Sequence, residues 1–361
     1  METRRLVDPP PSGRSPAVAL TTHLVAARWQ LNLGMAVLWL VVAGLLYLAL
    51  RAVPLVDILR VLSRVGVWQV VALTAANLLI LGLMTARWAI LLRSLGHPVG
   101  LFSLVGLRLA GFGVSYFTPG PQFGGETVQV DLLRRRGVPL PVAISSVFLD
   151  RLVDVLANFT FLVIGLVTLV SSGVFAGISA GWAWALIPGL LILPLAHLAA
   201  LWMGRQPLTW LLAGLTRRLP WPGLARAHSL TSQSETQISV LCQTQPGTLA
   251  RVILLSGLIW LLVVFEFTLT LQFIGVQPTL VQVVSVLTAA RVAFLMPLPG
   301  GIGALEASQV LITQALGWGA PIGVALSLII RARDLLLASA GMWLGGIAYR
   351  KAVVAPDELP G

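Results

Sequence analysis

Long uninterrupted apolar stretches are the feature that most constrains the fold of this chain. A helix needs about 20 consecutive apolar residues to cross the hydrocarbon core of a bilayer, and six stretches of the 361-residue sequence meet that requirement. They cover residues 31–50, 67–92, 141–171, 181–203, 247–274 and 320–349. Only 10% of the residues are charged, against about 25% in soluble domains. The sequence therefore predicts an all-α polytopic membrane protein with six transmembrane helices, and it excludes an ordinary soluble enzyme.

The distribution of basic residues predicts which helix ends face the cytoplasm. Residues 1–30 are polar, rich in proline and basic, and we expect them to form a disordered cytoplasmic tail. If the N-terminus is inside, most basic residues lie on the cytoplasmic side, as the positive-inside rule requires. They include Arg87 and the basic residues of the loop 204–246 and of the tail 351–361. Both termini are then cytoplasmic, most simply in a prokaryotic plasma membrane. The basic stretch 51–66 is the exception, and its helical apolar spacing indicates a helix lying in the membrane interface.

Two further apolar regions are broken in the middle by proline and glycine. Residues 101–137 contain the break Thr118–Pro121, and residues 281–317 contain the break Met296–Gly301. If the first region crossed the bilayer completely, the later loops would violate the charge rule. Each region is therefore predicted to form a re-entrant hairpin of two short helices. Irregular backbone at membrane depth is tolerated only beside protein or a water-filled cavity, so both breaks indicate a cavity.

The two broken regions belong to an internal repeat with a constant offset of 180 residues. The offset relates Ala110 to Ala290, Pro119 to Pro299, Gly120 to Gly300, Glu126 to Glu306, Arg151 to Arg331, Asp154 to Asp334 and Gly165 to Gly345. Glutamate, arginine and aspartate are scarce in this chain, so their recurrence at one spacing indicates a duplication. The topology opens the two hairpins to opposite sides, and we therefore predict inverted repeats over residues 31–172 and 173–350. Inverted repeats with discontinuous helices are typical of secondary transporters.

The repeated arginines are predicted to lie near the middle of the membrane. Arg151 and Arg331 fall about ten residues into their spans, which is ~15 Å deep at about 1.5 Å per residue. A charge at that depth costs roughly 2.5–3.5 kcal/mol, so each one needs a partner. Spacing i,i+3 places Arg151 and Asp154 on one helix face, and likewise Arg331 and Asp334.

Two interpretations of these charges remain open. In the structural interpretation, each arginine bridges its own aspartate and the nearby glutamate, and the cluster only braces the fold. In the functional interpretation, Arg151 and Arg331 hold an anionic headgroup through bidentate contacts to phosphate. Glu126 and Glu306 would then position the arginines or bind an ammonium group.

Glycines and prolines at the breaks complete the predicted substrate site. The glycines precede short helices, whose N-terminal amides would point into the break and favour negative charge. Close helix packing explains small residues equally well. The predicted substrate-binding residues are Arg151, Arg331, Glu126, Glu306, Asp154, Asp334, Pro119, Gly120, Gly124, Gly125, Pro299, Gly300 and Gly301.

Other polar residues carry weaker signals. Glu266 lies deep in the fifth span and is a candidate proton carrier or a hydrogen-bonded structural residue. Arg108 and Arg291 precede the breaks and could contact lipid headgroups or carbonyls. The four histidines do not stand at metal-ligand spacing, and the single Cys242 excludes an intramolecular disulfide. We therefore predict no metal site, no cofactor and no catalytic constellation.

Three segments resemble a known family. They are Pro119–Glu126, Val147–Asp154 and Pro297–Glu306, the last together with Arg331. They are similar to the membrane region of the lysylphosphatidylglycerol synthase/flippase called the multiple peptide resistance factor, and to its stand-alone flippase-like relatives. The resemblance covers roughly residues 30–350. It implies translocation of a lipid headgroup between leaflets, such as an aminoacylated phosphatidylglycerol or a polyprenyl-linked sugar.

Larger members of that family carry a cytosolic domain that makes the aminoacyl lipid. Only about ten residues follow the last predicted span, so we expect the synthase activity to be absent and any aminoacyl lipid to be made by a separate enzyme. The favoured function is a lipid flippase acting on membrane phospholipid or polyprenyl-linked lipid, without nucleic acid, and with a homodimer left open. The alternatives are a membrane-embedded enzyme acting on a lipid phosphate and an accessory membrane subunit.

Overall fold

The computed structural model describes residue 44 and residues 53–118, 124–171, 181–218, 222–296 and 298–354. Several predictions lie outside the described residues: the tail 1–30, most of the span 31–50, the loop 172–180, and Pro119 and Gly120. Within the described ranges, all regular elements are helices. The all-α polytopic architecture is therefore confirmed at that level.

After the short helix α2 (Leu55–Leu62), the next four helices are α3 (Val67–Ser94), α4 (Leu101–Phe117), α5 (Gly125–Arg134) and α6 (Leu140–Ser171). A second set of four is α10 (Pro246–Phe273), α11 (Leu280–Phe294), α12 (Ala304–Ala315) and α13 (Ala320–Val354), with the short 3-10 turn η1 (Pro299–Gly301) before α12. The bounds of the two sets agree closely at the offset of 180 residues. The largest difference at a break is that α11 ends three residues before the position that corresponds to Phe117.

Three helices in the described ranges are long and apolar enough to cross a membrane, namely α3, α6 and α10. They correspond to the predicted spans 67–92, 141–171 and 247–274. The predicted spans 181–203 and 320–349 are observed as the helices α7 (Gly181–Trp202) and α13. The latter carries Arg331, Arg333 and Asp334 in its middle, which interrupt its apolar run.

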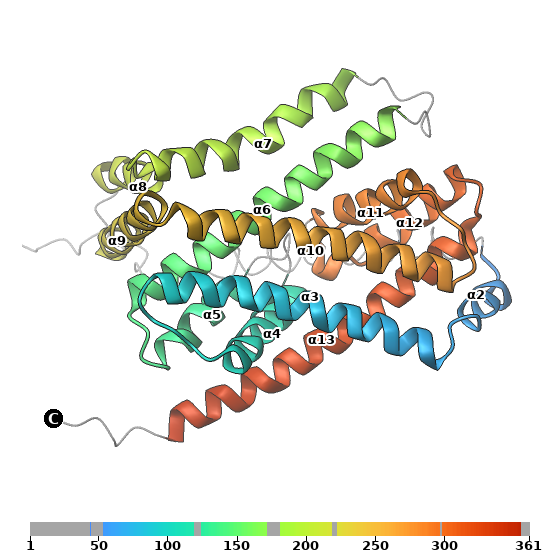
Figure 1. The fold of residues 1–361 in the computed structure, drawn as a ribbon, viewed down its shortest axis with the longest axis horizontal. Coiled ribbons are helices and arrows are strands. Elements are labelled where there is room, and N and C mark those ends of the chain that lie inside the picture. The colour runs from blue at the N-terminus through green and yellow to red at the C-terminus, as the bar shows by residue number, and fades with distance from the viewer. Residues whose placement is uncertain are drawn as a thin grey trace, which may run out of the picture.

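The two sets of four helices pack across each other (Figure 1). The helix α3 lies beside α10, while the hairpin helix α4 packs on α13 and its counterpart α11 packs on α6. Figure 1 shows that α3 runs from the end of the molecule near α2 toward the end near α9 (Pro222–Thr244), and that α10 runs the opposite way. The helices α6 and α13 are likewise opposed. Each hairpin therefore rests on the long helix of the other set.

Glycines allow these crossings to be close. A Cβ atom added at Gly165 of α6 would lie 1.8 Å from the Thr288 hydroxyl oxygen of α11. A Cβ atom added at Gly341 of α13 would lie 1.9 Å from the Leu109 carbonyl oxygen of α4. No side chain fits at either position, so the long helices touch the hairpins with their backbones.

The predicted loop 204–246 is largely helical. It forms α8 (Pro207–Arg218) and α9 (Pro222–Thr244). The helix α9 packs on α6, and Ile238, Leu241 and Cys242 are buried there against Leu149. The carboxylate of Glu235 accepts hydrogen bonds from the backbone amides of Leu208 and Thr209 and so caps the start of α8. This apolar face and this cap explain why the segment folds as an extra helical layer.

Candidate functional site

The first half-site consists of Glu126, Arg151 and Asp154. Glu126 lies in the first turn of α5, where its Oε2 accepts a hydrogen bond of 2.8 Å from the backbone amide of Gly124. The Nε atom of Arg151 on α6 lies 3.2 Å from Glu126 Oε1, and its Nη1 lies 3.7 Å from Asp154 Oδ2. The side chains of Arg151 and Glu126 remain 30% and 28% exposed. This half-site is a loose, accessible ion cluster.

The second half-site consists of Glu306, Arg331 and Tyr116. Glu306 lies in the first turn of α12, where its Oε2 accepts a hydrogen bond of 2.7 Å from the amide of Gly303. Arg331 of α13 donates to both carboxylate oxygens of Glu306, from Nε at 2.8 Å and from Nη2 at 3.3 Å. Its Nη1 donates to the carbonyl oxygen of Gly300 and to the Tyr116 hydroxyl at 3.2 Å. The side chains of Arg331 and Glu306 are only 10% and 7% exposed.

The predicted contact between Arg331 and Asp334 is wrong. Asp334 is paired instead with Arg333, whose Nε lies 2.9 Å from Asp334 Oδ1. The physical reason is a local difference between the repeats, because the position corresponding to Arg333 is the uncharged Val153. In the first half, Asp154 pairs with Arg151 at 3.7 Å and with Arg87 of α3 at 3.2 Å.

Arg87 was missed as a site residue by the sequence analysis. It was assigned to the cytoplasmic end of the span 67–92, but its side chain is only 1% exposed. Its guanidinium donates to Asp150 at 2.8 Å, to Asp154 at 3.2 Å and to the hydroxyl of Ser256 on α10 at 3.0 Å. A signal was present: Asp150 and Asp154 lie one turn apart in an apolar helix, and Arg151 alone cannot neutralise them and Glu126.

Arg108 and Arg291 occupy different places from those predicted. Arg108 forms an ion pair of 2.7 Å with Asp150, and its guanidinium lies over the ring of Trp88 at 5.5 Å. Arg291 lies over the ring of Trp260 at 4.8 Å. Protein groups thus contact both arginines, and aromatic faces stabilise their charges.

Glu266 is buried on α10 with polar partners from two other helices. Its Oε1 accepts a hydrogen bond of 3.3 Å from Asn77 on α3, and its Oε2 lies 3.7 Å from Arg333 on α13. Thr270 adds a weak contact of 3.5 Å. Glu266 therefore connects three long helices.

The glycines of the breaks shape the backbone, and the amides around them already have acceptors. Gly124, Gly300 and Gly301 have positive φ angles of 124°, 54° and 65°, a region that favours glycine. The amide of Gly125 donates to the Ser115 hydroxyl at 2.9 Å, while Glu126 occupies the amide of Gly124. Pro299 begins the turn η1. The glutamates thus take the positions that an anion would take at these helix starts.

Among the side chains that the structure describes, no group of three or more histidine, cysteine, aspartate or glutamate residues could hold a metal ion. The polar clusters consist instead of arginine paired with carboxylate.

The fold and these clusters define a polytopic α-helical membrane protein with two broken helical hairpins, each bearing a glutamate that pairs with an arginine of the long helix that follows. Residues 33–341 match the family described as the lysylphosphatidylglycerol synthase TM region. Since this match covers most of the chain, the protein belongs to that family.

Two relatives resemble the chain. A UPF0104 membrane protein of Methanothermobacter thermautotrophicus is 26% identical over 304 residues, which cover 81% of this chain and 88% of the relative. A UPF0104 membrane protein of Methanocaldococcus jannaschii is 28% identical over 130 residues, 35% of this chain and 39% of the relative. No solved structure matches the chain.

Proposed function

We propose that this protein moves an anionic or aminoacylated lipid headgroup between the two leaflets of the membrane. The observation that carries the proposal is the recurrence, in both hairpins, of a first-turn glutamate bound to an arginine of the following long helix. Intramembrane charges are costly and mark substrate or ion pathways more often than not. The family description names a phospholipid-modifying protein, which supports a lipid substrate.

The proposal includes an inverted membrane topology. The helices of each hairpin have 17 and 10 residues in one set and 15 and 12 in the other, all shorter than the roughly 20 residues that a crossing needs. Each hairpin then enters and leaves the membrane on one side. The opposed directions of α3 and α10 and of α6 and α13 support inversion (Figure 1). Both termini would lie in the cytoplasm of a prokaryotic cell.

In this proposal, the carboxylates of Glu126 and Glu306 bind the arginines whenever no lipid headgroup is bound. A phosphate group can reach Arg151 or Arg331 only in competition with the carboxylate that already holds the guanidinium. Protonation of Glu126 or Glu306 removes that negative charge, so the arginine becomes free to bind the headgroup phosphate in a bidentate manner. Deprotonation restores the ion pair and releases the lipid. Lipid exchange and proton binding are thereby coupled at the same carboxylate.

Glu266 is the proposed carrier that links this exchange to a proton gradient. It is buried, it contacts Arg333, and it joins α3, α10 and α13. A change in its protonation would alter the charge between the two halves of the molecule. Because no offset counterpart of Glu266 carries charge, such coupling would give the repeats different roles.

The lipid itself would come from another protein. An aminoacylated phospholipid substrate requires a separate lipid-modifying enzyme, and a polyprenyl-linked substrate requires a glycosyltransferase. The transporter would need no cofactor of its own. The acyl or polyprenyl chains would remain in the bilayer while the headgroup passes between α4, α6, α11 and α13.

Reconstitution into vesicles tests the proposal. Labelled anionic lipids are placed in one leaflet, and their transfer is compared for wild type, Arg151→Ala, Arg331→Ala and the surface control Arg251→Ala. We expect transfer to fall about tenfold or more in the first two variants, as for loss of a charged hydrogen bond. Equal transfer in all four proteins would refute the site. Chemical conversion of the lipid without transfer would favour a membrane-embedded enzyme instead.

A further inference from the structure

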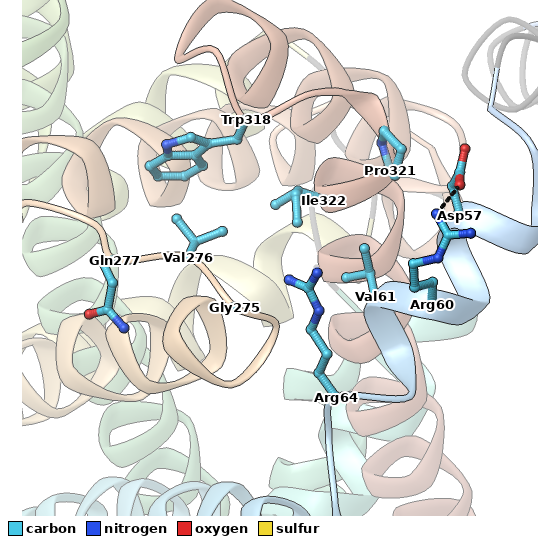
Figure 2. Close-up of a pocket in the computed structure, with 10 residues that line it drawn as sticks. All are labelled: Asp57, Arg60, Val61, Arg64, Gly275, Val276, Gln277, Trp318, Pro321 and Ile322. Carbon is cyan, nitrogen blue, oxygen red and sulfur yellow. Dashed lines mark hydrogen bonds and ion pairs between the residues drawn. The ribbon is translucent and has the colours of Figure 1, made fainter.

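A polar pocket lies at the end of the molecule near α2 (Leu55–Leu62), and neither half-site contributes to its lining. Its volume is about 510 Å³, which falls in the range of about 300–1,000 Å³ typical of ligand sites. Figure 2 shows that its walls come from α2, from the turn after α10 and from the turn between α12 and α13. The polar and aromatic lining is formed by Asp57, Arg60, Arg64, Gln277 and Trp318.

Arg64 is held in place at this pocket by the end of α10. Its Nη1 donates a hydrogen bond of 3.1 Å to the Ile274 carbonyl oxygen. Gly275 follows with a φ angle of 93°, a region that favours glycine, and a Cβ atom there would lie 2.1 Å from Nη1, so a larger residue would displace the Arg64 side chain. In Figure 2 the guanidinium points into the space between the Gly275 turn and Ile322. The contact to Ile274 uses one of five guanidinium N–H donors.

The charge of the lining selects the ligand. Arg60 is paired with Asp57 at 2.9 Å, while Arg64 is bound to a neutral carbonyl. The three ionised side chains therefore sum to one positive charge. A phosphodiester carries one negative charge, and its free oxygens match the planar guanidinium group. The pocket is thus complementary to a phosphodiester headgroup with a net charge of −1, whereas a zwitterionic headgroup adds to the same phosphodiester a cation that the arginines repel.

The position of the pocket favours a lipid over a soluble ligand. The helices α3 and α10 each have 28 residues and measure ~42 Å at about 1.5 Å per residue, longer than the hydrocarbon core of about 30 Å. The pocket lies at the end of both, at headgroup depth. Beside the pocket, the apolar residues Leu55, Val56 and Leu59 of α2 are 72%, 64% and 58% exposed. A phospholipid could place its headgroup in the cationic pocket and its acyl chains against this apolar face.

We propose that this pocket binds the phosphodiester headgroup of an anionic phospholipid at the membrane surface near α2, with Arg64 and Arg60 contacting the phosphate. The acyl chains lie along Leu55, Val56 and Leu59. This site is separate from the intramembrane half-sites, and its occupation does not require transport.

A quenching experiment on the full chain tests the pocket. Gln277, whose side chain points away from Arg64 in Figure 2, is replaced by cysteine and labelled with a fluorophore, while the native Cys242 is buried. The protein is placed in nanodiscs of phosphatidylcholine that contain either phosphatidylglycerol or phosphatidylcholine spin-labelled near the headgroup. We expect stronger quenching by the phosphatidylglycerol, and an apparent affinity about tenfold lower in Arg64→Gln and in Arg60→Gln.

Arg136→Gln is the matched control. Arg136 also donates to a backbone carbonyl, that of Ser103, at 3.1 Å. The Arg136→Gln variant therefore loses the same charge and the same kind of hydrogen bond as Arg64→Gln, but outside the pocket. Arg60→Gln leaves the bond between Arg64 and Ile274 intact and guards against misfolding.

Three results would overturn the inference: equal quenching by both lipids, equal quenching in the pocket and control variants, or fluorescence that responds to inorganic phosphate but not to phosphatidylglycerol. Arg151→Ala should retain full binding here. Failure of the pocket is thereby distinguished from failure of the proposed transport.

Discussion

The two half-sites contain the same glutamate and arginine at the same spacing, yet they differ in exposure. The Arg151–Glu126 pair is 30% and 28% exposed, whereas the Arg331–Glu306 pair is 10% and 7% exposed. The difference arises from neighbours that the repeat does not share. The Tyr116 hydroxyl accepts a hydrogen bond from Arg331, while its offset counterpart is Met296, which has no hydroxyl oxygen to accept one. The surroundings, and not the ion pair itself, decide which half-site is accessible.

This comparison teaches how a duplicated site can hold two states at once. In the proposed transport cycle, the exposed half-site is ready to exchange its carboxylate for a headgroup, and the buried one is not. If the two half-sites exchanged their surroundings, the buried half-site would become accessible and the exposed one would become buried. The glutamate–arginine pair itself would stay the same in both. The predictions below test the features that make the halves differ.

The largest effect is expected at Arg87, which supports only the first half-site. Its offset counterpart is Phe267. Arg87→Ala leaves Asp150 and Asp154 without their buried partner, which typically costs 3–5 kcal/mol. Unfolding in mixed detergent measures the loss. Arg135→Ala, which breaks a partly exposed pair with Asp131, should cost about 1 kcal/mol or less. Similar losses in both variants would contradict the role of Arg87.

The second-largest effect is expected from replacing the two glutamates, whose contributions to the free energy of unfolding can be compared directly. Glu306→Gln removes a charge from a buried bidentate pair and should destabilise the protein by about 2–3 kcal/mol. Glu126→Gln removes a charge from an exposed pair and should cost about 1 kcal/mol or less. The same unfolding assay applies to both variants. If Glu126→Gln were the more damaging, the difference in burial would not govern the two half-sites.

Tyr116→Phe is expected to have a smaller effect on stability, about 1.5 kcal/mol for one hydrogen bond to a charged group. Its consequence for accessibility is more informative. Modification by the arginine reagent phenylglyoxal, followed by mass spectrometry, should be faster at Arg151 than at Arg331 in the wild type. Loss of the tyrosine hydroxyl should narrow that gap. An unchanged ratio of modification rates would show that Tyr116 does not protect Arg331.

The smallest expected effect is the low reactivity of the native Cys242 thiol toward maleimide. Burial raises the pKa of the Cys242 thiol to about 11, so fewer than about one thiol in a thousand is ionised at pH 7.5. Wild-type protein should resist maleimide at neutral pH and react only as the pH approaches 11. Ser179→Cys and Ser229→Cys can then report topology on this background. Labelling of both from the same side would contradict the inverted arrangement of the halves.

Local patterns in the sequence predicted the helices, the two breaks and the pairing of Glu126 with Arg151 and of Glu306 with Arg331. These features depend on periodicity, on proline and glycine positions and on a constant offset. The contact between Tyr116 and Arg331 spans 215 residues and has no counterpart in the repeat, so no internal comparison could reveal it. The charge rule assigns Arg87 to the cytoplasmic end of its span, because it treats a basic residue near a span end as exposed.

The predicted pairing of Asp334 failed for a related reason. Spacing i,i+3 permits Arg331 to reach Asp334, but it does not rank Arg331 against the adjacent Arg333. Which of two cations takes one carboxylate depends on what else each of them contacts. Arg331 is already occupied by Glu306, Gly300 and Tyr116, and that information exists only in three dimensions.

The backbone contacts at Gly165 and Gly341 bear on the ancestry of the molecule. Because α4 rests on α13 and α11 rests on α6, a single set of four helices would leave one face of its hairpin uncovered. Under the proposed inverted topology, an unduplicated ancestor would have covered that face with a second copy of itself, inserted into the membrane in the opposite direction. Fusion of two such genes would have freed each copy to change alone, and Tyr116 and Arg87 are differences that a symmetric pair of identical subunits could not have acquired on one side only.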